Sequence, residues 1–88
     1  MQHQGGVTVQ FDPFAAIRRL ELLKRRPYTL KEIAAASGVH PNTMQRAAKG
    51  KVRRVDLDTL EGLMTFFERE GMPVEITDLL IVKRSEAA

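Results

Sequence analysis

Residues 29–50, TLKEIAAASGVHPNTMQRAAKG, constrain the fold of this 88-residue chain more than any other segment, because they have the pattern of two short helices that meet at a glycine. The Thr29 hydroxyl can accept a hydrogen bond from the first turn of a helix, while Glu32 reaches back to the Thr29 N–H. Gly38 ends this helix, because glycine adopts the left-handed conformation of a helix C-cap without steric cost. The inward stripe between them comprises Leu30, Ile33, Ala34 and Ser37.

The second helix of this segment is expected to begin at His40 and Pro41. His40 is the N-cap residue, and Pro41 suits the first turn, where its missing N–H is not needed. Its inward side is formed by Val39, Met44 and Ala47, and its outward side by Asn42, Thr43, Gln45, Arg46 and Lys49. A short turn containing glycine joins two such helices at a steep angle. The second helix therefore presents a polar face of long side chains to solvent.

A longer helix is predicted on the N-terminal side of this pair. Asp12 and Pro13 form a cap and a first-turn proline, so the helix is expected from Pro13 to about Arg26, and Pro27 ends it. Its inward stripe is Ala16, Ile17, Leu20 and Leu23.

Another amphipathic helix is predicted on the C-terminal side. Its cap is Asp56 or Asp58, and Asp58 together with Glu61 is expected to form a capping box. A glycine and a proline at 71–73 terminate it. Its inward stripe, which runs to about Glu70, comprises Leu57, Leu60, Leu63, Met64 and Phe67.

Both ends of the chain are expected to contribute a strand. Val7, Val9 and Phe11 alternate with polar residues, which is the period of a half-buried strand. Periodicity alone does not assign the short apolar run near residue 80, but a lone strand would leave its backbone groups unpaired, so residues 79–83 are expected to pair with residues 7–11. The expected organisation is a flexible tail at 1–6, one domain at 7–84 with the helix pair at 29–50, and a second tail at 85–88.

Length and composition exclude several classes of protein. Eighty-eight residues are enough for one modest core without a separate sensor domain. The chain has no cysteine, which removes disulfide frameworks and thiolate metal sites, and no apolar run approaches the roughly 20 residues that cross a membrane. The N-terminus lacks an export pattern. We therefore expect a cytoplasmic protein that does not contact a membrane.

Positive charge is concentrated just after the helix pair. The formal net charge is only +3, but residues 46–54 carry cations and no acid, whereas acids dominate residues 56–78. An ordinary solvated loop is the alternative to a patch that binds phosphate groups. The cations of this segment are Arg46, Lys49, Lys51, Arg53 and Arg54.

Taken together, these motifs resemble the helix-turn-helix family of the phage repressors, Cro and lambda repressor, or Xre type, over about residues 14–80. The matching elements are Ala34, Gly38-Val39, Asn42-Thr43-Met44, Gly50-Lys51 and the VDLDTLE segment at 55–61. The lactose-repressor and mercury-regulator types have a similar local string but place it at the extreme N-terminus, whereas here a helix precedes it. The resemblance implies a mainly α fold of four to five helices, to which the terminal pairing adds a small two-stranded ribbon.

The resemblance also implies a DNA interface. A recognition helix over residues 41–49 would place Asn42, Gln45 and Arg46 at base edges, with Pro41 limited to apolar contact. Local helix capping is the alternative role for Asn42 and Thr43. The family often has a phosphate-binding glutamine where this chain has Leu30. The residues expected at phosphate groups are Thr29, Lys31, His40, Thr43, Lys49, Lys51, Arg53 and Arg54.

The resulting hypothesis is a transcriptional regulator, a repressor, that binds double-stranded DNA sequence-specifically as a homodimer. The candidates for its dimer surface are Phe66, the ribbon edge and Met72, although core edge is the favoured position of Phe66. The alternative is a protein-binding module that engages RNA polymerase or a toxin-like partner. We expect no enzymatic activity, no cofactor and no metal site, because the chain has no nucleophile–base set and its two histidines are 37 positions apart.

Overall fold

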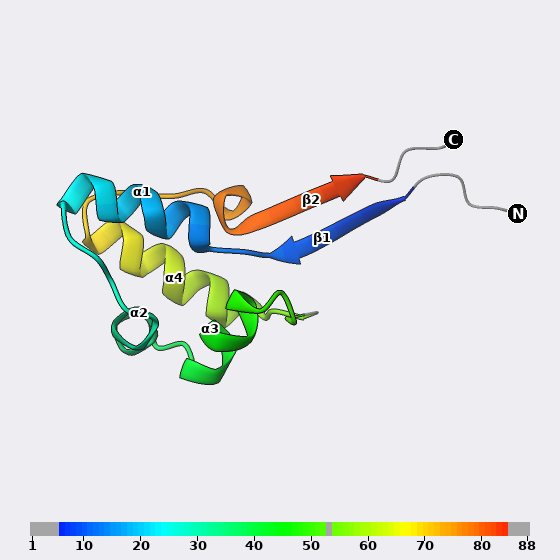
Figure 1. The fold of residues 1–88 in the computed structure, drawn as a ribbon, viewed down its shortest axis with the longest axis horizontal. Helices are drawn as coiled ribbons and strands as arrows, with labels where there is room; N and C mark the ends of the chain where they lie inside the picture. The colour runs from blue at the N-terminus through cyan, green and yellow to red at the C-terminus, as the bar shows by residue number, and fades with distance from the viewer. Residues whose placement is uncertain (1–5, 53, 85–88) are drawn as a thin grey trace, which may run out of the picture.

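The computed structural model describes residues 6–52 and 54–84, and these form a small helical body with a two-stranded ribbon (Figure 1). The predicted mainly α fold is confirmed, with four α-helices among the described residues. Most of the predicted tails, residues 1–5 and 85–88, lie outside the described ranges, as does Arg53. The elements in order are β1 (Val7–Phe11), α1 (Phe14–Lys24), α2 (Leu30–Ser37), α3 (Pro41–Ala48), α4 (Leu57–Arg69), the 3-10 turn η1 (Ile76–Leu79) and β2 (Leu80–Arg84).

The core lies where all four helices and η1 meet. Helix α4 supplies two fully buried residues, Leu63 and Phe67, because its apolar positions recur at helical spacing. The other large side chains that are fully buried are Pro13, just before α1, and one from each remaining helix and from η1, namely Leu20, Ile33, Met44 and Leu79. Since the core draws on α2 and α3 as well as on their flanking helices, it fixes the position of the helix pair within the body.

Helix α1 differs from its prediction at its C-terminal end. It ends at Lys24, two residues early, and Arg25 adopts the left-handed conformation with φ of 57°. Leu23 was predicted to face inward and is 57% exposed, so this expectation is wrong. The last turn of α1 lies at the edge of the body (Figure 1), one turn beyond the buried Leu20.

Helix α4 begins earlier than a cap at Asp58 would require. The Asp56 carboxylate accepts a hydrogen bond of 2.9 Å from the Thr59 N–H, so Asp56 is the cap and the expected capping box of Asp58 with Glu61 does not form. Leu57 is therefore the first residue of the helix and is 68% exposed, which corrects its assignment to the inward stripe. The buried stripe begins one turn later.

Phe66 belongs to the core. It is 4% exposed, and its ring packs edge-on against those of Tyr28 and Phe67. The favoured core position is confirmed, and Phe66 is no longer a candidate for a dimer surface.

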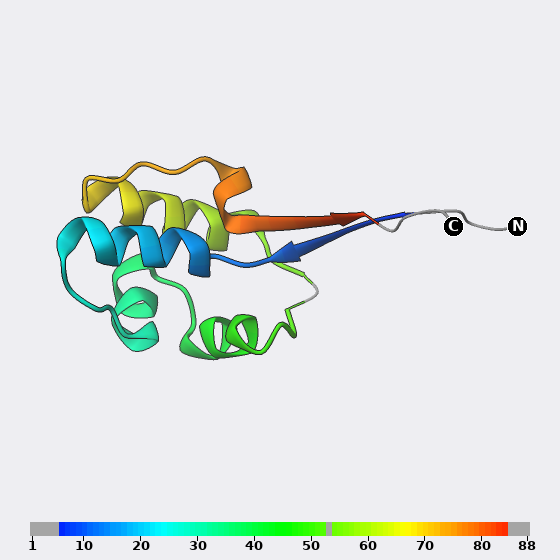
Figure 2. The ribbon, with the colours of Figure 1, turned by 45° about the horizontal axis from the view of Figure 1, so that its top comes forward.

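The terminal ribbon is confirmed with a shift of one residue. Strand β1 pairs antiparallel with β2, which begins at Leu80 rather than at Leu79, because Leu79 ends η1 and its carbonyl accepts the Asp12 N–H at 2.8 Å. Only the base of the ribbon is buried, at Phe11. Val7 and Val9 are 58% and 57% exposed, so the expectation of a half-buried strand is wrong for them. Figures 1 and 2 show the reason, which is that the ribbon leaves the helical body.

Candidate nucleic-acid interface

The capping box at the start of α2 forms as predicted. The Thr29 hydroxyl accepts from the Glu32 N–H at 3.0 Å, and the Glu32 carboxylate accepts from the Thr29 N–H at 2.9 Å. At the other end Gly38 adopts φ of 77°, as the predicted C-cap requires. Both ends of α2 are therefore set by local hydrogen bonds and backbone conformation.

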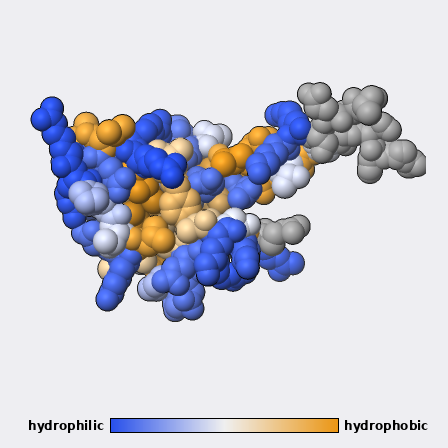
Figure 3. Space-filling model, viewed as in Figure 1, coloured by the Kyte–Doolittle hydropathy of each residue, from blue (hydrophilic) through white to orange (hydrophobic). Residues whose placement is uncertain are grey.

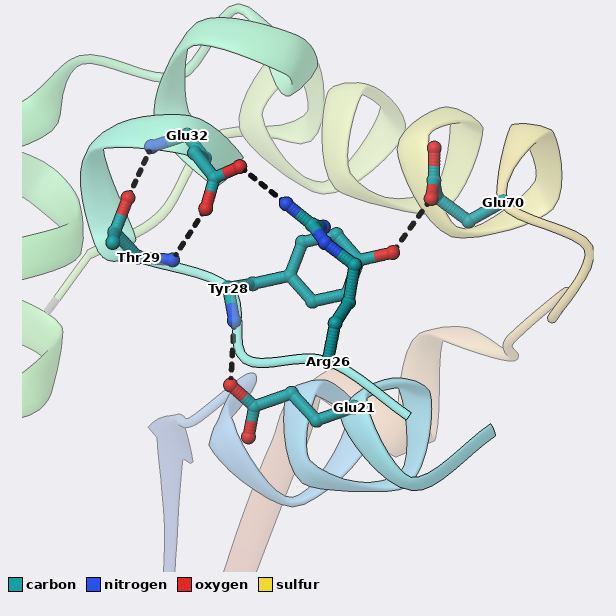
Figure 4. Close-up of polar contacts among 6 residues, drawn as sticks. All are labelled: Glu21, Arg26, Tyr28, Thr29, Glu32 and Glu70. Carbon is teal, nitrogen blue, oxygen red and sulfur yellow. Dashed lines mark hydrogen bonds and ion pairs between the residues drawn. The ribbon is translucent and has the colours of Figure 1, made fainter. Parts of the chain in front are cut away.

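A polar cluster attaches the start of α2 to α1 and α4 (Figure 4). The Tyr28 N–H donates to the Glu21 carboxylate at 2.8 Å, and the Tyr28 hydroxyl donates to the Glu70 carboxylate at 2.7 Å. The Arg26 guanidinium lies 4.0 Å from the centre of the Tyr28 ring and pairs with Glu32 at 2.6 Å. Burial raises the pKa of the Tyr28 hydroxyl, and the bond to Glu70 raises it further, so the hydroxyl remains a donor at neutral pH.

Sequence reasoning did not find this cluster. Tyr28 and Glu70 are 42 positions apart, and no spacing rule links residues at that separation. The cluster matters for the interface because it fixes where α2 begins, and α2 in turn supports α3.

Helix α3 begins at Pro41, behind a histidine cap. The His40 Nδ1 accepts the Asn42 N–H at 3.1 Å, which confirms the predicted cap. Met44 and Ala47 are buried, so α3 packs against the core through one side only. Its opposite side faces solvent.

The outward side of α3 carries the candidate base-reading residues. Pro41, Asn42 and Gln45 are exposed, and Thr43 is half-buried. In Figure 2, α3 lies along the lower edge of the body, remote from the tip of the ribbon. The candidate readers thus lie together on a surface that is open to a ligand.

Arg46 is exposed but already has one partner. Its guanidinium donates to the Lys51 carbonyl at 3.4 Å, so the side chain extends along α3 toward the following loop. Arginine has five N–H donors, so this long contact leaves most of them available. The position of Arg46 between the helix and the loop suits either a base or a phosphate contact.

The candidate phosphate-binding residues lie on both sides of α3. Lys49, Lys51 and Arg54 are exposed in the segment that follows α3, and Lys31 is exposed on α2. Arg53 falls outside the residues that the structure describes. Within the described ranges, the ion pairs are Arg19–Asp78 and Arg26–Glu32, and neither uses a cation of this surface. Among the described residues, no lysine or arginine of this surface therefore lies within ion-pair distance of a carboxylate.

Other kinds of site were also sought in the described ranges. No three His, Asp or Glu side chains there lie close enough to share a metal ion. None of the helices described has the length and apolar character needed to cross a membrane.

The two capping carboxylates make stability depend on pH. Hydrogen bonds from the Thr29 and Thr59 backbone N–H groups lower the pKa of Glu32 and of Asp56 below their ordinary values, and Arg26 contributes to the shift at Glu32. A lowered pKa in the folded state stabilises the fold above the ordinary carboxyl pKa of about 4, and this contribution is lost as the pH falls further.

We therefore expect the free energy of unfolding, measured by urea titration, to be level above about pH 5 and to fall below it. The variant Asp56→Asn should flatten this fall, because asparagine also caps helices but does not titrate there. An equally steep fall in the variant would show that Asp56 does not contribute.

Comparison with known proteins gives one family. A family model described as a Cro/C1-type HTH (helix-turn-helix) DNA-binding domain matches residues 20–83. Neither the curated proteins nor the solved structures include a match to the chain. The family match begins within α1 and includes the whole of α2, α3 and α4, so it covers the surface described above.

Proposed function

Since the chain belongs to the family of Cro/C1-type helix-turn-helix DNA-binding domains, we propose that it is a transcriptional repressor that binds double-stranded DNA sequence-specifically as a dimer. The family establishes a DNA-binding regulator. One observation supports the finer proposal most strongly: α3 exposes Asn42, Gln45 and Arg46 together, and cations follow directly in the next loop.

In the proposed complex, α3 lies in the major groove. Asn42 and Gln45 are suited to adenine, because a side-chain amide can donate from its NH₂ group to N7 and accept from the N6 amino group in a bidentate pair, and Arg46 is suited to guanine. Arg46 would exchange its 3.4 Å contact with the Lys51 carbonyl for a shorter charge-assisted bond. Pro41 offers only apolar contact, for instance to a thymine methyl group.

Phosphate contacts would hold the helix in register from both sides. On one side are the cations of the loop after α3, Lys49, Lys51, Arg53 and Arg54; on the other are Thr29 and Lys31 at the start of α2, with His40 and Thr43 near the start of α3. Leu30 offers no side-chain hydrogen bond there. These contacts contribute affinity and orientation but do not read sequence.

A dimer follows from the amount of sequence that one α3 can read. One recognition helix contacts about 4–5 base pairs, which is too few to single out a site among roughly 10⁶ competing sites. Two copies would bind half-sites about one helical turn apart on an inverted repeat. Bound over a promoter, such a dimer would exclude the polymerase, and this is the reason for proposing repression. The proposed location is the cytoplasm.

Selection of bound duplexes from a random pool tests this proposal. We expect an inverted repeat with half-sites about 10 base pairs apart, centre to centre. The variant Gln45→Ala should lose about tenfold discrimination at one position of each half-site, since one bidentate pair contributes about 1–3 kcal/mol.

The control is Glu61→Ala, which truncates an exposed side chain of α4. It should select the same sequence as the unmodified protein. If no sequence is enriched, or if Gln45→Ala keeps every preference, α3 does not read bases and the protein-binding alternative is favoured.

A further inference from the structure

The terminal ribbon extends past the proposed DNA-binding surface. Figures 1 and 2 show that β1 and β2 leave the body beside the loop that follows α3 and continue beyond this loop. Thr8 and Lys83 lie opposite one another near the outer end of the ribbon, and both are exposed. A strand rises about 3.3 Å per residue, so Lys83 lies about 7 Å farther from the body than Ile81. The ribbon therefore offers a second surface that a long ligand could reach.

The charge of the ribbon is positive at its outer end. Among the ten residues of β1 and β2, the side chains that ionise at neutral pH are Lys83 and Arg84, and both are exposed. The ion pairs of the described residues, Arg19–Asp78 and Arg26–Glu32, use neither of them. In Figure 3 hydrophilic surface covers α3 and appears again toward the outer end of the ribbon. This end of the ribbon is therefore complementary to an anionic partner.

The two faces of the ribbon differ in chemistry. Side chains alternate between the faces of a strand, so one face carries the three exposed valines and Arg84. The other face, which we call the polar face, comprises Thr8, Gln10, Ile81 and Lys83. Directly opposite residues have Cβ atoms about 5 Å apart, so the Thr8 hydroxyl and the Lys83 ammonium can bind the same anion. Both groups are common ligands of DNA phosphates.

The polar face lies on the side of the molecule where α3 ends. At its base, Gln10 and Ile81 line a pocket together with the last two residues of α3, Ala47 and Ala48, and with Gly50. The Gln10 side chain lies so close to Gly50 that a Cβ there would be 3.3 Å from the amide nitrogen. The valine side of the ribbon borders a different groove, next to Val52 and Val55. Lys83 therefore extends from the side of the ribbon that faces the end of α3.

This placement makes the polar face continuous with the proposed DNA interface. A duplex that receives α3 in its major groove continues beyond the base pairs that α3 reads, and it carries one negative charge per about 1.7 Å of its axis. The outer end of the ribbon is remote from α3 (Figure 2), so it lies too far away for the half-site itself. The part of the duplex that matches its position is the sequence next to the half-site.

We propose that Lys83, with Thr8 beside it, binds a phosphate group of the DNA that flanks the half-site. This inference rests on the proposed function, because α3 must dock first for the ribbon to meet the flank. The contact is to the DNA backbone, so it adds affinity and orientation without reading sequence. The other role for a lysine here is to keep an exposed strand edge from pairing with another chain, and that role does not involve DNA.

The test compares three duplexes that contain the same selected half-site. One ends at the edges of the half-site, and each of the other two is extended by one helical turn, roughly 10 base pairs, on one side or the other. Fluorescence anisotropy over a salt series gives the affinity and its salt dependence for the full-length protein. The extension on the side away from the ribbon controls for the greater length and charge of the longer DNA.

For the unmodified protein we expect one of the two extensions to tighten binding by about fivefold at physiological salt, as one further phosphate contact would, and the other to have little effect. The variant Lys83→Gln should lose this gain, and its slope of log affinity against log salt on that duplex should be shallower by about 1. Lys83→Arg should keep the gain because it keeps the charge. The matched control is Arg84→Gln, which removes the same charge from the other face and should also keep it.

Three outcomes would overturn the inference while leaving the proposed function intact. These are half-site binding that neither extension improves, equal gains from both extensions, and equal losses in Lys83→Gln and Arg84→Gln, which would indicate attraction by net charge. Failure of the unmodified protein to bind any of the three duplexes would instead contradict both proposals. Circular dichroism of each variant verifies that the fold is retained, and the duplex without extension verifies that α3 still binds.

Discussion

Replacing Gly62 by alanine is expected to destabilise the protein by about 2–3 kcal/mol, the upper part of the range for overpacking a core. In a solvent-exposed helix the same change stabilises by about 1 kcal/mol, because alanine is the better helix former. Here a Cβ on Gly62 would lie 2.3 Å from the Ser37 carbonyl oxygen and 3.4 Å from its carbon. The obstacle is backbone, so it cannot move aside as a flexible side chain would.

The effect should extend to DNA binding. Ser37 is the last residue of α2, and Gly38 and Val39 connect it to α3, so moving α4 away from Ser37 also moves the corner that positions the recognition helix. Urea unfolding measures the loss of stability, and DNA titration at a temperature where the variant remains folded measures the loss of affinity. The control is the neighbouring exposed residue, in Glu61→Ala, which should change neither. A Gly62→Ala protein as stable as the original would show that α4 does not approach α2 this closely.

Reversing the charge of Lys51 and Arg54 together, to glutamate, is expected to weaken DNA binding by about 100-fold at physiological salt. Each lysine or arginine at a phosphate group releases a counterion, and each glutamate adds repulsion in its place. For about five phosphate contacts per protomer, log affinity should fall against log salt with a slope of roughly −4 or steeper, and the variant's slope should be shallower. Fluorescence anisotropy over a salt series measures both quantities.

A matched control reverses Lys24 and Arg69, which changes the net charge by the same amount. These two residues end α1 and α4, at the opposite end of the body from the loop after α3 (Figure 1). If binding depends on the local patch, the control should keep most of its affinity, and both variants should keep the circular-dichroism spectrum of the fold. Equal losses in both would indicate attraction by net charge alone.

The helix pair could be predicted because its determinants are local. Thr29 and Glu32 lie within one turn, Gly38 acts through its own backbone, and His40 caps the helix that starts at the next residue. Periodicity also separated the buried Met44 from its exposed neighbours. Interactions between residues only a few positions apart can be predicted from the spacing of those residues in the sequence.

The remaining features depend on contacts between distant segments. Leu23 and Leu57 fit their stripes, yet each lies in a terminal turn and stays exposed. Asp56 and Asp58 are equally suitable caps by type, and only the packed helix selects Asp56. The close approach of Gly62 to α2 likewise depends on how two helices pack, which no pattern within either helix specifies.

For the interface, periodicity predicted which side of α3 is exposed, but it did not predict the hydrogen bond from Arg46 to the Lys51 carbonyl. It also did not predict that the ribbon would leave the body and expose its valines. Both features follow from the path of the chain after α3 and after η1, where the sequence offers no regular spacing.

The most direct measurement of the central claim is an amide chemical-shift titration of the protein with its selected duplex. The account predicts the largest changes along the outer side of α3, at Asn42, Gln45 and Arg46, and in the loop from Lys49 to Arg54. Changes confined to another surface, such as the exposed leucines at the end of α1, with α3 unaffected at saturating DNA, would contradict it.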